Sequence, residues 1–246
     1  MKKSIFRTTD PWGPLEVLDD GAKRFLTFGN DHEQSCQIKA QPHIPQHEYN
    51  RAIMVCLLFS QPKRVCIMGL GGGTSVLAFL NACPNSDVYA VELRQEVIRV
   101  AQKYFQLPKH EARLTITNQD ALDFVQQENE PFDILTGDLY HHHGIDEILL
   151  QKQFLKNCAN NLSDSGWLVL NYWLDHDLNQ NVLQQLHEDF ECIYACNSGG
   201  GNLILIAGKK QPIEDYLNPS VIKPLAKKLG FSLNYYIKRL TLLNLS

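Results

Sequence analysis

Short, almost wholly apolar runs alternate with amphipathic segments from about Tyr49 to residue 210 of this 246-residue chain. The predicted strands are 63–70, 86–93, 112–118, 132–139, 166–173, 191–197 and 202–210, and helical spacing fills 49–60, 74–84, 95–105, 120–127, 147–162 and 178–190. Strands that are apolar on both faces are typical of parallel sheets covered by helices on both sides. The alternation therefore predicts an α/β fold with a doubly wound, mainly parallel sheet of seven strands. The last two strands have no helix between them, so we expect them to form an antiparallel hairpin at one edge.

The two ends of the chain have a different texture. Residues 1–48 contain the short alternating stretches PLEVLDD, KRFLTFG and SCQIKA, separated by the turn sequences DDG and GND. This pattern predicts a small antiparallel β-hairpin unit. Residues 211–246 show amphipathic helical spacing, which predicts a C-terminal helical extension. The chain thus divides into 1–48, a Rossmann-like domain over 49–210, and 211–246.

Composition bears on the partners and the compartment. The net charge is −4 and no run of Lys and Arg occurs, so the sequence indicates no nucleic-acid partner. No apolar stretch approaches the roughly 20 residues of a membrane span, and the opening MKKSIFRTTDPWG lacks the apolar segment of a signal peptide. Seven cysteines lie mostly in apolar runs without a CxxC pair. These features predict a cytoplasmic protein with reduced thiols and no membrane partner.

A glycine-rich turn lies between the first predicted apolar strand and its helix, in the stretch CIMGLGGGTSVLAFL. Gly69, Gly71, Gly72 and Gly73 allow a ligand to contact the backbone, and the helix N-terminus adds free N–H groups. Glu92 ends the next strand, 21 residues after Gly71. A carboxylate about 20 residues beyond such a turn holds the ribose hydroxyls in Rossmann-type sites. The alternative is a turn for tight strand–helix packing beside a solvated Glu.

Two more acids follow later strands at the same predicted edge of the sheet. These are Asp120 and Asp138, and they join Glu92 at the carboxyl ends of the strands, where ligands bind in open α/β sheets. Three acids suit a positively charged nucleoside better than a phosphate-rich dinucleotide. They favour S-adenosylmethionine or its decarboxylated form, each a sulfonium, as the donor. The alternative for each acid is a helix N-cap, which fits Asp120 better than Asp138 because ALDFV follows Asp120 directly.

Several runs together resemble the spermidine synthase (polyamine aminopropyltransferase) family: KRVCIMGLGGG, YAVELRQEVIRVAQKYF, TNQDALDFV, FDILTGDLY and FLKNCANNLSDSGWLVLN. The sequence is most similar to the bacterial spermidine synthase-like branch with a GLGGG loop, and the resemblance runs from about Leu15 to Lys209. It implies a Rossmann-like class I methyltransferase fold behind a β-hairpin domain, with 49–210 as the nucleoside-binding catalytic domain. It also implies aminopropyl transfer from decarboxylated S-adenosylmethionine to a small-molecule amine, and frequently a homodimer.

The resemblance assigns a donor side residue by residue. Glu92 matches the acid that the family uses on the ribose hydroxyls, and Asp120 with Ala121 matches the Asp-Ala pair at the adenine. Gln34 resembles the family's glutamine that reaches the donor. Asp138 matches the first Asp of the D-S-x-D-P loop, which deprotonates the attacking amine.

On the acceptor side the sequence departs from the family pattern. The Asp of the family's GGGDGG loop falls at Gly72, the second Asp of D-S-x-D-P falls at His141, and the Tyr of Y-x-E falls near Gln46. A diamine carries two cations and ordinarily needs carboxylates at both ends. We therefore expect weak activity with putrescine, and the acceptor amine stays open. Gln46, His47 and His141 are the acceptor-side candidates.

The loop after Asp138 holds two further features. Tyr140 is a candidate to orient the acceptor, and an exposed loop tyrosine is the equal alternative. The HHH run at 141–143 invites a metal interpretation, but adjacent loop residues point in different directions and no Cys or carboxylate lies at a ligand spacing. The sequence therefore predicts no metal.

Three functions stay open from the sequence. The first is an aminopropyltransferase of the spermidine synthase type. The second is an S-adenosylmethionine-dependent methyltransferase, because the lost acid at Gly72 leaves room for a donor carboxylate against the loop N–H groups. The third is a non-catalytic nucleoside-binding homologue, against which the presence of Asp138 argues.

Overall fold

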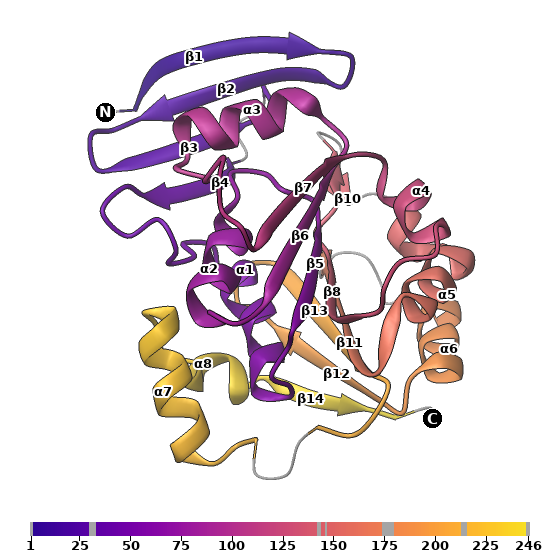
Figure 1. Cartoon of the computed structure of the whole chain (residues 1–246). Helices are drawn as coiled ribbons and strands as arrows, with labels where there is room; N and C mark the ends of the chain where they lie inside the picture. The colour runs from indigo at the N-terminus through magenta and orange to yellow at the C-terminus, as the bar shows by residue number, and fades with distance from the viewer. Residues whose placement is uncertain are drawn as a thin grey trace.

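The structure is a computed structural model and describes residues 2–29, 33–141, 144–145, 147–173, 180–212 and 216–244. These residues form an eight-stranded sheet with helices on both faces, a four-stranded antiparallel sheet and a short two-stranded hairpin (Figure 1). No helix in this part of the chain is both long enough and apolar enough to cross a membrane.

The eight-stranded sheet has the order β14-β12-β13-β11-β8-β5-β6-β7. The parallel strands are β5 (Arg64–Met68), β6 (Asp87–Glu92), β7 (Leu114–Asn118), β8 (Phe132–Gly137) and β11 (Leu162–Trp173). The antiparallel strands are β12 (Cys192–Asn197), β13 (Asn202–Gly208) and β14 (Leu240–Leu243). The chain leaves β5 toward β6 and β7 and then returns to place β8 on the other side of β5. This reversal makes the carboxyl ends of β5 and β8 the switch point at which open α/β sheets bind ligands.

The C-terminal segment extends the sheet that the sequence predicts. The hairpin of β12 and β13 is present, but β14 pairs with β12 and takes the outer edge. The extension therefore contains α7 (Pro219–Leu229) and α8 (Asn234–Ile237) and also an eighth strand. An edge strand of four residues carries no long apolar run, so its sequence is a weak strand signal.

Helices cover each face of the sheet over a separate apolar cluster. One face, at the right of Figure 1, is covered by α4 (Ala121–Gln126), α5 (Lys152–Asn160) and α6 (Gln180–Asp189). The other face is covered by α1 (Glu48–Ile53), the 3-10 turn η1 (Met54–Leu58), α2 (Thr74–Ala82), α3 (Gln95–Tyr104) and α7. The segment 49–60 was expected as one helix. It tightens into η1 after Ile53, where every residue of the turn is buried.

The N-terminal sheet packs over α3 at one end of the molecule (Figure 1). Its strands are β1 (Lys3–Asp10), β2 (Gly13–Asp19), β3 (Lys23–Thr27) and β4 (Glu33–Ile38), paired in sequence order. The three stretches expected from sequence form β2, β3 and β4, and β1 is an additional edge strand. Asp20 accepts hydrogen bonds from the N–H groups of Ala22 and Lys23, which closes the predicted DDG turn. The smaller elements are β9 (Tyr140–His141), β10 (Gly144–Ile145) and the 3-10 turn η2 (Glu147–Leu150).

A buried ion pair links the N-terminal sheet to the larger domain. Arg94 Nε and Nη2 donate to the Asp10 carboxylate at 3.0 and 2.9 Å, and Nη2 also donates to the carbonyl of Gly13 at 2.8 Å. The two side chains are only 8% and 7% exposed. The Arg94 guanidinium also lies 4.5 Å from the ring centroid of Phe28. Because Arg94 directly precedes α3, this contact ties the β1–β2 turn to the end of β6.

We expect Arg94→Met to lower the free energy of unfolding by about 3–5 kcal/mol, because Asp10 would then be buried without its partner. Urea unfolding monitored by circular dichroism measures the change. Arg99→Met is the matched control on the same helix, since Arg99 pairs with Glu96 while 67% exposed. It should cost no more than about 1 kcal/mol. Equal losses in the two variants would contradict the role given to the Asp10–Arg94 pair.

Candidate active site

The glycine turn after β5 lies directly against the loop that follows β8. Gly69 has a φ of +94°, and a β-carbon built there would lie 2.1 Å from the carbonyl oxygen of Asp138. The Asp138 N–H donates to the carbonyl of Met68, and the Gly69 N–H donates to that of Val91, each at 2.9 Å. Only glycine fits a position with this φ and this close approach. The turn therefore brings the loop after β8 and the end of β6 together.

Strand β4 of the N-terminal sheet packs against the same turn. The N–H of Gly72 donates to Ser35 Oγ at 2.7 Å. A β-carbon at Gly72 would lie 2.9 Å from the Ser35 β-carbon and 3.0 Å from a ring atom of Phe105. Gln34 lies close by, since its carbonyl oxygen is 4.0 Å from a β-carbon built on Gly71. The acid that the resembled family carries in this loop would not fit at Gly72, because Ser35 and Phe105 fill the space.

Glu92 ends β6 with a carboxylate that is 9% exposed. Its Oε2 accepts from the N–H of Leu70 at 3.0 Å, and its Oε1 accepts from the N–H of Arg94 at 2.9 Å. Burial raises the pKa of Glu92, while these backbone hydrogen bonds act in the opposite direction. A carboxylate offers about four acceptor positions, so capacity remains for hydroxyl donors from a ligand.

Asp120 caps α4, because its Oδ1 accepts from the N–H of Leu122 at 2.7 Å. Ala121, the first residue of the helix, is buried. The preceding N–H, that of Gln119, donates to the Glu92 carbonyl at 3.1 Å, which ties the ends of β7 and β6 together. Asp120 and Glu92 therefore share one edge of the sheet, as the sequence indicated, and the cap interpretation of Asp120 is correct.

Asp138 is a half-buried carboxylate that interacts with one amide and with two phenols. Its Oδ1 accepts from Asn171 Nδ2 at 2.8 Å. Burial raises its pKa to about 6, and the hydrogen bond from Asn171 opposes that rise. Burial also raises the pKa of Tyr49 and of Tyr140, and the Asp138 charge raises both further. Asp138 makes no ion pair with any residue that the structure describes.

Three residues of this cluster were not among the sequence candidates. Tyr49 comes from α1, and its hydroxyl lies 3.5 Å from the Gln34 carbonyl oxygen. Asn171 is fully buried in β11, and Asn202 at the start of β13 is 9% exposed. The one signal for Asn171 is an amide inside the apolar strand GWLVLNYW, where a buried polar side chain needs a partner.

The acceptor-side candidates are placed less favourably. Gln46 donates from Nε2 to the carbonyl of Ile44, two residues back. His47 stacks on the ring of Tyr49 at 5.5 Å between centroids, and burial lowers its pKa. Tyr49, three residues after Gln46, is the tyrosine of this region whose pKa the Asp138 charge raises, and the acceptor-side role of Gln46 stays a prediction. His142, His143 and the side chain of His141 lie outside the described residues.

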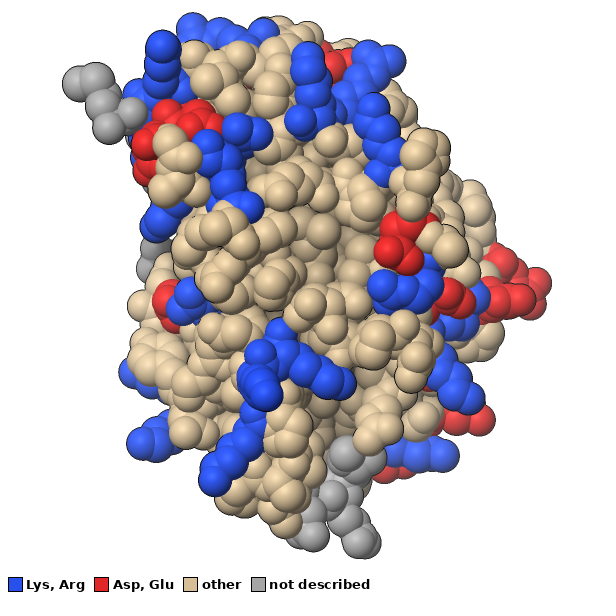
Figure 2. Space-filling model, turned by 60° about the vertical axis from the view of Figure 1, so that its left-hand side comes forward, with Lys and Arg blue, Asp and Glu red and all other residues tan. Residues whose placement is uncertain are grey.

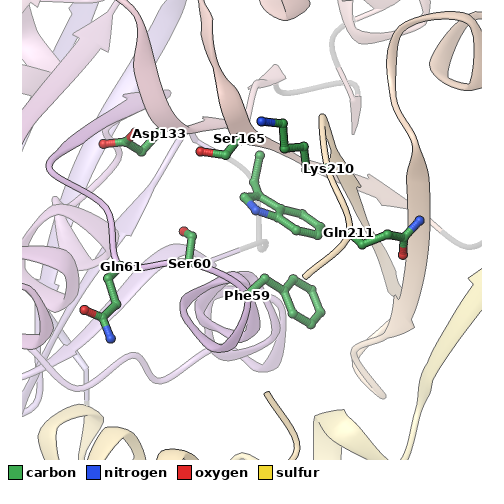
Figure 3. A pocket seen from close by; sticks show the side chains of 8 residues that line it. Phe59, Ser60, Gln61, Asp133, Ser165, Lys210 and Gln211 are labelled. Carbon is green, nitrogen blue, oxygen red and sulfur yellow. The ribbon is translucent and has the colours of Figure 1, made fainter. Parts of the chain in front are cut away.

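Figure 3 shows a pocket of about 330 Å³ at the opposite ends of the strands, lined by Phe59, Ser60, Gln61, Asp133, Ser165, Trp167, Lys210 and Gln211. Asp133 is fully engaged there, because it accepts from the N–H groups of Lys63 and Arg64 and from Ser163 Oγ. Its hydrogen bonds join the N-terminal ends of β5, β8 and β11. This pocket is therefore separate from the edge that holds Glu92 and Asp138.

Charged side chains are interspersed on the face seen in Figure 2, around a largely uncharged middle. Lys and Arg side chains cover more of this face than Asp and Glu do, and they lie in several separate groups.

The fold and the edge of acids define a class: a nucleoside-binding transferase built on a class I methyltransferase-like sheet. The spermine/spermidine synthase domain family matches residues 46–197, which is more than half of the chain. The chain belongs to this family.

Individual relatives agree with the assignment. A polyamine aminopropyltransferase of Neisseria meningitidis serogroup A is 27% identical over 218 residues, which cover 87% of this chain and 82% of that protein. The crystal structure of a probable spermidine synthase from Corynebacterium glutamicum has a TM-score of 0.77 at 19% identity, over 99% of this chain and 91% of the other. Human methyltransferase-like protein 13 has a TM-score of 0.62 at 23% identity, over 75% of this chain and 91% of its own. The two structures confirm the predicted fold class.

We expect Glu92→Gln to weaken nucleoside binding by about 1–3 kcal/mol, because hydrogen bonds to the charged carboxylate are lost. Isothermal titration calorimetry with methylthioadenosine measures the affinity. Glu96→Gln, four residues away on the outer surface of α3, is the control and should bind normally. Unchanged affinity in Glu92→Gln would identify Glu92 as a support of the turn only.

Proposed function

We propose that this protein transfers an aminopropyl group from decarboxylated S-adenosylmethionine to an amine, as a member of the spermidine synthase family in polyamine biosynthesis. The observation that carries the proposal is the half-buried Asp138 carboxylate, which accepts from Asn171 and raises the pKa of the Tyr49 and Tyr140 phenols, at the edge that also holds Glu92. Relatives at 27% and 28% identity are named polyamine aminopropyltransferases, which supports the same reaction.

Two observations fit a nucleoside donor at the glycine turn. Glu92 keeps acceptor capacity for ribose hydroxyls beyond its bonds to Leu70 and Arg94. Thr74, the first residue of α2, is 5% exposed, and its hydroxyl has no hydrogen-bond partner among the described residues. A ligand seated at the turn supplies such a partner.

The reaction is a direct displacement at the carbon bound to sulfonium. Asp138 takes one proton from the acceptor nitrogen, whose lone pair then forms the new C–N bond. The C–S bond breaks and its electron pair stays on sulfur, which becomes the neutral thioether of methylthioadenosine. Alignment of nitrogen, carbon and sulfur in the site can supply roughly 7–11 kcal/mol of the barrier. Asp138 suits the proton step because a base works best when its pKa lies near the operating pH.

The methyltransferase alternative loses its main support in this structure. It required open space and free N–H groups at Gly72 for a donor carboxylate. The Gly72 N–H is instead bound by Ser35, and Phe105 closes the remaining space.

The acceptor remains a proposal in two parts. Tyr49 supplies a phenol beside Asp138, which removes one of the three reasons to expect weak diamine binding. The substitutions at Gly72 and His141 remain, so we propose an amine other than putrescine as the better acceptor. Methylthioadenosine release, assayed with a panel of diamines and monoamines, tests this. Efficient turnover of putrescine would overturn the acceptor assignment, and methyl transfer without any aminopropyl transfer would overturn the proposed function.

We expect Asp138→Asn to lower kcat by roughly 10²–10⁴-fold while methylthioadenosine still binds, because the amide keeps the shape but cannot accept the proton. In the wild type, kcat/KM should fall as the pH drops through about 6, where Asp138 of the free enzyme becomes protonated. The variant should be at least as stable as the wild type at alkaline pH, since it removes a charge that desolvation disfavours. A stable variant with normal kcat would contradict the base assignment.

We also propose that the protein is a homodimer in a reducing compartment such as the cytoplasm. The dimer rests on the family resemblance. The compartment is supported by seven cysteines that are all free thiols and mostly buried. Multi-angle light scattering over a range of concentrations should give twice the chain mass of 28.0 kDa. A constant monomer mass would contradict the dimer.

A further inference from the structure

Three polar side chains, two of them buried and one half-buried, meet at the carboxyl edge of the sheet. Asp138 follows β8, Asn171 lies near the end of β11, and Asn202 begins β13. These strands are adjacent, with β11 parallel to β8 and antiparallel to β13. The end of β11 and the start of β13 therefore lie beside Asp138.

The hydrogen bonds in this group run in one direction. A carboxylate can only accept, so Asn171 presents its amide N–H to Asp138 Oδ1, at 2.8 Å. The Asn171 Oδ1 then accepts from Asn202 Nδ2 at 3.0 Å. The same Asn202 nitrogen donates to the Tyr140 hydroxyl at 3.2 Å, and that hydroxyl donates to the Asn171 carbonyl at 3.2 Å. Asn202 therefore fixes the orientation of the Asn171 amide. The ionised Asp138 carboxylate determines the direction of these hydrogen bonds, because it can only accept.

We propose that Asn171, held by Asn202, is a positioning residue that keeps the Asp138 carboxylate oriented for proton removal from the acceptor amine. The role in catalysis rests on the function proposed above. The arrangement of the three side chains does not, so it can be tested without any substrate.

The surroundings of Asp138 leave this role to the amide. Within the part of the chain that the structure describes, the titratable groups that interact with it from the packed elements are the phenols of Tyr49 on α1 and Tyr140 on β9. Neither is charged near neutral pH, because burial raises the pKa of both. Among the described residues, Asn171 is the hydrogen-bond donor that lowers the pKa of Asp138 against its burial.

The first experiment measures the pKa of Asp138 directly. The free energy of unfolding is compared between wild type and Asp138→Asn, and between Asn171→Ala and the double variant Asn171→Ala/Asp138→Asn, from about pH 4 to about pH 9. The pKa of Asp138 is raised in the folded state, so its charged form lowers the free energy of unfolding. Each difference between a variant pair therefore grows with pH and becomes constant above the folded pKa of Asp138. With Asn171 present it should level off just above pH 6. Without Asn171 we expect this about 1–2 pH units higher, the worth of one hydrogen bond to a charge.

The second experiment follows kcat/KM against pH, because this ratio reports the pKa of the free enzyme. Asn171→Ala should lower kcat/KM roughly tenfold near pH 6 and change it little near pH 9, because the deprotonated fraction of Asp138 falls only at the lower pH. Asn202→Ala should shift the low-pH fall of the activity profile (its acid limb) to higher pH by a smaller amount. The double variant Asn171→Ala/Asn202→Ala should show the same shift as Asn171→Ala alone. Asn161→Ala is the control, since Asn161 is also buried but its amide bonds the carbonyls of Val125 and Asn157. It should lower stability without moving the acid limb.

The outcomes separate the two proposals. If the two stability differences level off at the same pH, the positioning role is wrong, whatever the activity. If they level off at different pH values but no amine is alkylated, the arrangement holds and the proposed function fails. If Asn171→Ala does not fold, the same stability comparison is made between Asn202→Ala and the double variant Asn202→Ala/Asp138→Asn. An unchanged pKa of Asp138 in that comparison would contradict the role given to Asn171 and Asn202.

Discussion

The backbone of Asp138 lies so close to Gly69 that a β-carbon there would stand 2.1 Å from its carbonyl oxygen. This contact joins the turn after β5 to the loop after β8, across the point where the strand order reverses. The turn also contacts Glu92 through the Leu70 N–H. A side chain at Gly69 would separate the two loops and move the proposed base away from the proposed ribose acid. The site therefore depends on one glycine more directly than on any single charged residue.

Glu92 is buried and Asp138 is half-buried at this edge, and the protein stabilises the two carboxylates differently. Glu92 is held by backbone N–H groups, whose positions are fixed by the turn and by the start of α3. Asp138 is held by a side-chain amide, and its pKa of about 6 leaves it near the point where it can gain and lose a proton. The first arrangement suits a permanent acceptor of hydroxyl groups. The second suits a base that must exchange its proton in each turnover.

The N-terminal sheet completes the site from outside the larger domain. Ser35 occupies the Gly72 N–H, and the buried Asp10–Arg94 pair fixes this sheet beside the end of β6. Arg94 serves both parts, because its side chain binds Asp10 while its backbone N–H binds Glu92. Where the resembled family carries an acid, this chain has Gly72, and Ser35 of β4 packs against it.

Much of the fold could be read from local sequence. Uniformly apolar strands, the glycine spacing and Glu92 after β6 together predict the parallel sheet and its ligand edge, because these signals act within one strand–helix unit. The edge strand β14 and the first strand β1 carry weaker signals and were not predicted. Of the groups around Asp138, only Tyr140 was among the sequence candidates.

Tyr49, Asn171 and Asn202 come from a helix and two strands far apart in the chain. They meet only because β13 returns antiparallel beside β11 and α1 packs near their ends. The sequence by itself determined where the acids lie, since strand order along the chain places them at one edge. The tertiary structure decided which groups surround Asp138 and which way its hydrogen bonds run, because those depend on burial and on contacts between distant segments.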